Sequence, residues 1–178
     1  MYKEYKLGAC LPTFGSCADR FCLSGYGKGG STMEEMLELA KKVDGLDGLE
    51  LVSNWHVNDK NIRYVGRLFK DNGMEICMIV PDLWTQAKWG MGSIAAPDAK
   101  TRKQAVQEIK KSIDWAYELG CDYVDVWPGQ DGFDYPFQAD YQNAWKRLRD
   151  AIEECAQYNK KVKVLVEYKM KEPRTHCF

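Results

Sequence analysis

The stretch that decides the fold is an apolar run that stops on charged residues, Val162-Lys-Val-Leu-Val-Glu-Tyr-Lys169. Such a run is typical of a buried strand in a parallel sheet. Glu167 and Lys169 stand two residues apart, so a strand points both side chains to the same side. Ligands and catalytic groups of α/β folds gather at the carboxyl ends of parallel strands. The stretch is therefore either a functional strand end or a surface ion pair.

The composition indicates one ordinary soluble domain. The chain has 178 residues, of which 45% are hydrophobic and 29% charged, enough apolar material for a sizeable core. A net charge of -1 without a basic stripe argues against binding to nucleic acid or to anionic membranes. No apolar leader opens the chain and no later segment approaches a membrane span, so we expect a cytoplasmic protein.

The seven cysteines are scattered, and none forms a C-x-x-C pair. Cys77, Cys121 and Cys155 fall within apolar segments, where a free cysteine behaves as a small hydrophobe. Core or idle thiols are therefore favoured over metal ligands.

Strand-like and helix-like segments alternate along the chain. Strands are expected at residues 6–11, 49–52, 74–80, 122–126 and 162–169. Helices are expected to begin near residues 31, 61, 98 and 140, the first with a capping box made by Ser31 and Glu34. The order is βαβαβαβαβ, and helical connections of this length suit parallel strands joined by right-handed crossovers.

Two architectures fit this order. A doubly wound five-stranded sheet of flavodoxin type has about this length, but it normally needs a fifth helix to cover its final strand. The other architecture is the (β/α)8 TIM barrel, which is typically about 250 residues long. We favour an α/β fold in which residues 1–178 form a single domain. This domain is the N-terminal part of a barrel, with about five parallel strands and four helices, and without the C-terminal strands.

A glycine-rich segment raises the question of a nucleotide site. Gly25-Tyr-Gly-Lys-Gly-Gly30 satisfies the pattern G-x-G-x-x-G, and Glu50 follows it by twenty residues. A dinucleotide site needs these glycines at the turn directly after a strand, and here more than a dozen residues intervene. A plain loop is therefore favoured.

Loops after the expected strands carry residues with useful chemistry. His56, one of only two histidines, is followed three residues later by Asp59, which can fix the tautomer of the imidazole or cap the next helix. Trp84 and Trp127 follow the third and fourth expected strands. Their indole rings either wall a ligand or pack the end of a barrel.

Two motifs resemble those of xylose isomerase and its relatives among the xylose-isomerase-like barrels. They are Trp127-Pro-Gly-Gln-Asp-Gly132 and Val166-Glu-Tyr-Lys-Met-Lys-Glu-Pro-Arg174. In that family, a strand-four Trp-x-Gly-x-acid-Gly segment precedes a strand-five Glu-x-Lys-x-x-Glu-Pro-Arg motif, with a helix between them as here. The resemblance covers roughly residues 74–174. Tyr168 and Met170 replace common prolines, a difference that bears on the sugar more than on the chemistry.

The resemblance implies a divalent-metal-dependent sugar isomerase that interconverts an aldose and a ketose. The substrate is then a monosaccharide, and the cofactors are two divalent cations, Mg²⁺, Mn²⁺ or Co²⁺. Such hard cations prefer oxygen ligands, which suits a chain rich in carboxylates and poor in histidines.

The resemblance also assigns roles to residues. Glu167 is implied as a metal ligand, and Trp84 and Trp127 as walls of the substrate site. The implied catalytic residues are Lys169, which would hydrogen-bond a sugar oxygen, and the ring-opening pair His56 and Asp59.

Other functions remain open. An epimerase of the same superfamily would use metal-bound carboxylates for proton transfer, whereas the superfamily's abasic-site nucleases need a histidine-rich zinc cluster that two histidines disfavour. A non-catalytic five-stranded domain that binds a small molecule is the alternative from another class.

In the family, further metal ligands come from strands six to eight. We therefore expect the chain alone to bind metal weakly at most and to lack isomerase activity. The unpaired edge of its last strand predicts self-association, and a homo-oligomeric parent protein is compatible with the sequence.

Overall fold

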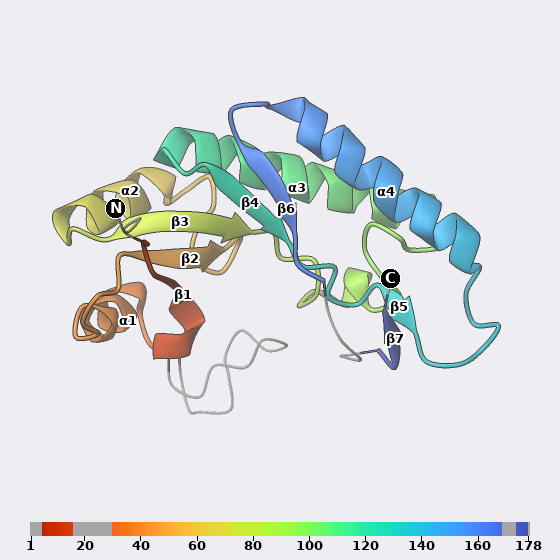
Figure 1. The fold of residues 1–178 in the computed structure, drawn as a ribbon, viewed down its shortest axis with the longest axis horizontal. Helices are drawn as coiled ribbons and strands as arrows, with labels where there is room; N and C mark the ends of the chain where they lie inside the picture. The colour runs from red at the N-terminus through yellow and green to blue at the C-terminus, as the bar shows by residue number, and fades with distance from the viewer. Residues whose placement is uncertain (1–4, 16–29, 169–173, 178) are drawn as a thin grey trace.

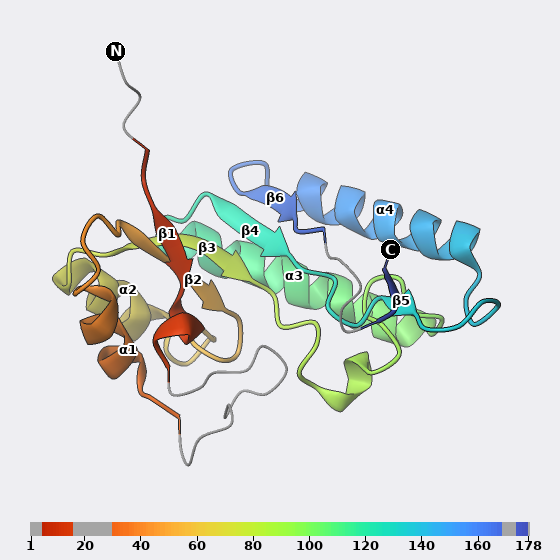
Figure 2. The same cartoon turned by 60° about the horizontal axis from the view of Figure 1, so that its bottom comes forward.

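Five parallel strands form one sheet, and the computed structural model describes residues 5–15, 30–168 and 174–177 of the chain. The order across the sheet is β1 (Gly8–Cys10), β2 (Gly48–Val52), β3 (Glu75–Val80), β4 (Tyr123–Val126) and β6 (Lys163–Val166), as Figure 1 shows. The connections contain the helices α1 (Met33–Ala40), α2 (Ile62–Asp71), α3 (Ala99–Leu119) and α4 (Tyr141–Tyr158). In Figure 2, α3 and α4 run side by side along β4 and β6.

Short elements complete the described part of the chain. The 3-10 helix η1 (Leu11–Phe14) follows β1 directly, and η2 (Ala87–Trp89) lies between β3 and α3. Strands β5 (Gly132–Phe133) and β7 (His176–Cys177) pair antiparallel and form a separate two-stranded sheet.

All four helices cover the same face of the main sheet. Leu51, Ile79, Val124 and Val164 are successive register partners across β2, β3, β4 and β6, and the first three are fully buried. Helices α1 and α2 pack with Leu49 and Leu51, while α3 and α4 pack with Ile79 and Val124. Helices on one face are the arrangement of a barrel wall, whereas a doubly wound sheet carries them on both faces. The prediction of a partial barrel with five strands and four helices is confirmed.

The other face of the sheet carries acidic residues. Glu50 lies between two buried leucines of β2, and Asp125 lies between two buried valines of β4. Successive strand residues point to opposite faces, so both carboxyl groups lie away from the helices. This alternation supplies the polar groups of the candidate site.

The ends of the helices largely follow the predicted signals. The capping box of α1 is present one residue later than expected: Thr32 and Glu35 bond each other's backbone N–H groups. Asp98 caps α3, and Gly120, with φ of 72°, ends it in the left-handed conformation. Residues 25–29 of the glycine-rich segment lie outside the described residues. Across the described ranges, none of the helices combines the length and apolarity that crossing a bilayer requires.

Replacing Leu51 tests the one-sided packing. Leu51 is fully buried between β2 and the helices, so we expect Leu51→Ala to lower the free energy of unfolding by about 2–5 kcal/mol through lost burial and a residual cavity. Leu39→Ala, at a residue of α1 that is 44% exposed, is the matched control. Urea unfolding of both variants measures the difference, and equal midpoints would contradict the packing described above.

Candidate active site

A cavity of about 400 Å³ opens at the carboxyl ends of the strands. Every parallel strand or the segment that follows it contributes to the lining. The lining residues are Cys10, Pro12, Thr13, Glu50, Val52, Trp55, Val80, Trp84, Trp127 and Glu167. The cavity therefore lies where the sequence predicts the site, and it combines aromatic rings with carboxylates.

Three tryptophans wall the cavity. The ring centroids of Trp84 and Trp127 are 5.1 Å apart at an interplanar angle of 84°, and those of Trp55 and Trp84 are 5.8 Å apart. The edge-to-face contact of Trp84 with Trp127 and the tilted contact of Trp55 with Trp84 restrict the orientations of the three rings. Gly129 is required beside them, because a Cβ at this position would lie 2.5 Å from Trp84 Cβ. Trp84 and Trp127 were expected here, whereas Trp55 was not singled out from the sequence.

Carboxyl groups from three strands lie close together. Glu167 follows β6, and its backbone N–H bonds Val126 O at 3.2 Å. Asp125 is only 7% exposed, and burial, followed by the charges of Glu167 and Glu50, raises its pKa to about 7. Burial likewise raises the pKa of Glu50, with Glu167 adding to the effect and a hydrogen bond from Cys10 opposing it. The site therefore concentrates negative charge in a partly desolvated space.

Sequence reasoning assigned no chemical role in this site to Asp125 or Glu50. Each is a lone acid within an apolar strand, in Leu49-Glu-Leu51 and Val124-Asp-Val126. An acid flanked by buried apolar residues on both sides points to the opposite face of a sheet, and this pattern is the signal that could have revealed them.

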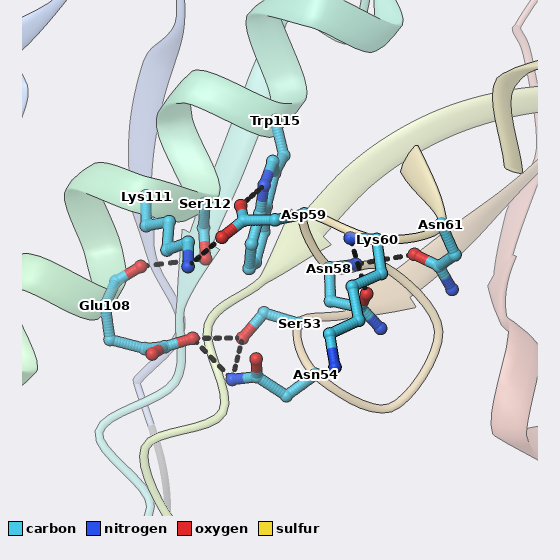
Figure 3. A network of polar contacts seen from close by, with 10 residues as sticks. All are labelled: Ser53, Asn54, Asn58, Asp59, Lys60, Asn61, Glu108, Lys111, Ser112 and Trp115. Carbon is cyan, nitrogen blue, oxygen red and sulfur yellow. Dashed lines mark hydrogen bonds and ion pairs between the residues drawn. The ribbon is translucent and has the colours of Figure 1, made fainter. Parts of the chain in front are cut away.

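His56 and Asp59 do not form the expected pair. The backbone N–H of Val52 donates to His56 Nδ1 at 2.9 Å, so this contact fixes the tautomer with the proton on Nε2. Asp59 instead accepts hydrogen bonds from Trp115 Nε1 at 2.9 Å and from Lys111 at 2.5 Å (Figure 3). The structure therefore contradicts the predicted pair, and Asp59 does not orient the imidazole of His56.

The loop after β2 turns toward α3, which explains why Asp59 leaves His56. Asn54 has a φ of 63°, and Glu108 of α3 accepts hydrogen bonds from Ser53 Oγ and Asn54 Nδ2, both at 2.7 Å. Ser53 Oγ also accepts from the backbone N–H of Asp82 at 2.8 Å. Figure 3 shows the contacts of Glu108 with Ser53 and Asn54 together with the contacts of Asp59. Asp59 does not cap α2 either, because Asn61 occupies the N-cap position.

His56 itself is buried beside the cavity. It is 5% exposed, and its ring meets Trp55 edge to face at 6.2 Å between centroids. Burial lowers the pKa of His56 to about 4, so the imidazole is neutral at pH 7. His56 thus supports an aromatic wall of the cavity without lining it.

Two polar residues tie the loops around the cavity to each other. Asp131, which is fully buried, accepts hydrogen bonds from Ser93 N at 2.8 Å and Ala95 N at 2.9 Å. Arg174 bonds Asp134 at 2.8 Å and also contacts the backbone carbonyl of Gly90. Loops after β3, β4 and β6 are therefore joined, which limits the movement of the tryptophans that they carry.

The predicted metal site is represented by one residue. Glu167 lines the cavity and offers the carboxylate oxygens that hard cations prefer. Lys169 lies outside the described residues. Within residues 5–15, 30–168 and 174–177, no group of three or more His, Cys, Asp or Glu side chains is placed to hold a metal ion.

The buried His56 predicts a pH dependence of stability. The unfolded chain binds a proton near pH 6.5 but the folded chain only near pH 4, so the stability contributed by neutral His56 is complete above about pH 6.5 and lost as the pH falls toward 4. The full difference is about 3 kcal/mol. Urea unfolding at pH 7.5 and 4.5 measures how much the free energy of unfolding falls on acidification. This fall should be smaller for His56→Gln than for wild type, with His176→Gln as the matched control. An equal fall in all three proteins would contradict a buried neutral His56.

Comparisons with known proteins agree with the fold. Residues 24–175 match the family described as the xylose isomerase-like TIM barrel. A xylose isomerase of Thermus thermophilus is 24% identical over 100 residues, which make up 56% of this chain and 26% of that enzyme.

Solved structures of sugar epimerases share the fold. D-Psicose 3-epimerase from Clostridium cellulolyticum H10, solved with D-tagatose, has a TM-score of 0.62 at 18% identity and is matched over 83% of this chain and 50% of its own. 3-Keto-D-glucoside 4-epimerase from E. coli has a TM-score of 0.60 at 18% identity, over 75% of this chain and 49% of its own. A D-tagatose 3-epimerase-like protein has a TM-score of 0.58 at 22% identity and is matched over 91% of this chain and 52% of its own.

The chain spans about half the length of these structures, with 49% to 52% of each covered. The family match includes most of the sequence, and the sheet, its one-sided helices and its cavity are those of a barrel wall. The chain belongs to the xylose isomerase-like TIM barrel family.

Proposed function

We propose that this chain forms part of the active site of a divalent-metal-dependent sugar isomerase that interconverts an aldose and a ketose. One observation carries the proposal: Trp84, Trp127 and the carboxylate of Glu167 line the same cavity at the carboxyl ends of the strands. Flat indole faces suit the C–H surfaces of a monosaccharide, and a carboxylate suits a hard cation. The resemblance to xylose isomerase, at 24% identity over 100 residues, supports the same assignment.

The residues of the chain have distinct roles in this proposal. Glu167 would hold a divalent cation, Mg²⁺, Mn²⁺ or Co²⁺, through its carboxylate oxygens. When bound, such cations polarise the oxygens of the substrate as Lewis acids. Trp84 and Trp127 hold the sugar and exclude water from the reacting carbons. Lys169 is proposed to donate a hydrogen bond to a sugar oxygen.

In this proposal His56 assists ring opening of the sugar, and its hydrogen bond to Val52 determines which ring nitrogen can do so. The backbone N–H of Val52 occupies Nδ1, so the Nε2–H group is the one that can donate to a sugar during ring opening. The imidazole is 5% exposed and does not line the cavity, so this role requires a movement that brings the sugar and the Nε2–H group together. Asp59 has no part in this step.

A sugar epimerase is the second candidate function. The solved structures that share the fold are epimerases or epimerase-like proteins, and they match 75% to 91% of this chain. An epimerase would use carboxylates to move a proton at the carbon beside the carbonyl. The cluster of Glu167, Asp125 and Glu50 offers groups of that type.

Replacing Glu167 tests the metal assignment. In the protein at its natural length, we expect Glu167→Gln to weaken Mn²⁺ binding, measured by calorimetry, by roughly 100-fold or more, because the amide carries no charge. Sugar conversion should fall with it. Glu118→Gln, at an exposed residue of α3, is the matched control. Unchanged Mn²⁺ affinity in Glu167→Gln would remove Glu167 from the metal site.

Solvent deuterium separates the two reactions. Conversion in D₂O by a hydride shift between adjacent carbons should leave the product free of carbon-bound deuterium, whereas epimerisation by proton transfer should introduce it. Mass spectrometry of the product measures the difference. Incorporation close to one deuterium per turnover would favour the epimerase. If, in the presence of Mg²⁺ or Mn²⁺, the protein neither bound nor converted any sugar, a non-catalytic binding domain would be favoured.

A further inference from the structure

The cavity holds a second carboxylate that the isomerase proposal does not use. Glu50 of β2 and Glu167 after β6 line the same space, although β3 and β4 lie between their strands. Three strand spacings amount to about 14 Å along a flat sheet. The bend of the sheet therefore brings these carboxylates toward one cavity, and a ligand there meets them from two sides.

Cys10 holds the Glu50 carboxylate in place. Cys10 and Glu50 are register partners of β1 and β2, and Cys10 Sγ donates to Glu50 Oε1 at 2.9 Å. Desolvation and the charge of Glu50 raise the pKa of the Cys10 thiol far above its usual range, so the thiol keeps its proton and remains a donor. A thiol is a weak donor, which leaves the carboxylate able to accept a stronger hydrogen bond from a hydroxyl group.

The described lining of the cavity carries acidic side chains. Its described lining contains Glu50 and Glu167 and no Lys or Arg side chain. Asp125 lies within reach of the charges of both. In the proposed function Glu167 binds a cation, which offsets its charge, so Glu50 is the carboxylate that would repel a phosphate or carboxylate on the part of a ligand beside it. A hydroxyl group of a neutral sugar can instead donate a charge-assisted hydrogen bond to Glu50.

We propose that Glu50, oriented by Cys10, accepts a hydrogen bond from a sugar hydroxyl and makes the site selective for neutral sugars over phosphorylated or acidic ones. This inference rests on the proposed function, since it requires a sugar in the cavity. Glu50 is then a substrate-binding and specificity-determining residue, and Cys10 is its positioning residue.

A purely structural role for Glu50 leads to a different expectation. Burial and the charge of Glu167 raise the pKa of Glu50, which means that the fold disfavours its ionised form. Glu50→Gln keeps the shape and removes the charge, so the variant should be at least as stable as wild type while it binds sugar less well. A structural residue would instead lower stability and leave substrate selectivity unchanged.

The test uses the protein at its natural length with Mg²⁺, a panel of neutral pentoses and hexoses, and their phosphate esters. In Glu50→Gln we expect the KM for the neutral sugar to rise roughly tenfold or more, as for a lost hydrogen bond to a charged group. The preference for neutral over phosphorylated sugar should fall by a similar factor, and the melting temperature should not decrease. Quenching of tryptophan fluorescence reports binding independently of turnover. Cys10→Ser, which retains a donor, should stay closer to wild type than Cys10→Ala.

Glu75→Gln is the matched control, because Glu75 lies at the other end of the sheet with its side chain 59% exposed. A Glu50→Gln protein that matches this control in KM and selectivity would overturn the inference alone. A wild-type preference for the phosphorylated sugar would overturn it as well. A wild-type protein that neither binds nor converts any sugar would remove the proposed function together with it.

Discussion

The alternation of side chains along β2 and β4 is the constraint on which this structure depends. In β2 and β4, apolar residues on one face pack against the helices, and Glu50 and Asp125 between them have no place in that packing. The alternation therefore places both acids on the face of the sheet that the helices leave uncovered. A shift of either strand by a single residue would bury a carboxylate among the helices and expose its apolar neighbours.

The acidic face carries an electrostatic cost that the aromatic walls increase. Three tryptophans wall the cavity, and burial raises the pKa of both Asp125 and Glu50. Such a site is less stable when empty than an apolar one, because the charges repel and are poorly solvated. A divalent cation and a hydroxyl-rich ligand would reduce this cost. Under the proposed function, the same clustering of charge, which is unfavourable in the free protein, would favour the binding of a neutral sugar.

Sequence patterns predicted the framework and part of the site. The order of strands and helices followed from periodicity, and Trp84, Trp127 and Glu167 reach one cavity because the ends of parallel strands meet at one edge of the sheet. The pairing of His56 with Asp59 was wrong because spacing does not determine which way a loop turns. Contacts with Ser53 and Asn54 draw that loop toward Glu108 on α3, a partner more than fifty residues away. Asp125 and Glu50 were missed because Asp125 was considered only as part of a strand and Glu50 only as the acidic residue of a possible dinucleotide motif, and neither for the face of the sheet that it occupies.

The most direct test of this account is a crystal structure of the protein at its natural length, grown with Mn²⁺ and soaked with a neutral sugar. The account predicts an anomalous manganese peak about 2.1–2.2 Å from a carboxylate oxygen of Glu167, within the usual range for a hard cation and its oxygen ligands. It also predicts a sugar between Trp84 and Trp127, with a hydroxyl within hydrogen-bonding distance of Glu50. Manganese bound elsewhere, or a sugar outside this cavity, would contradict it.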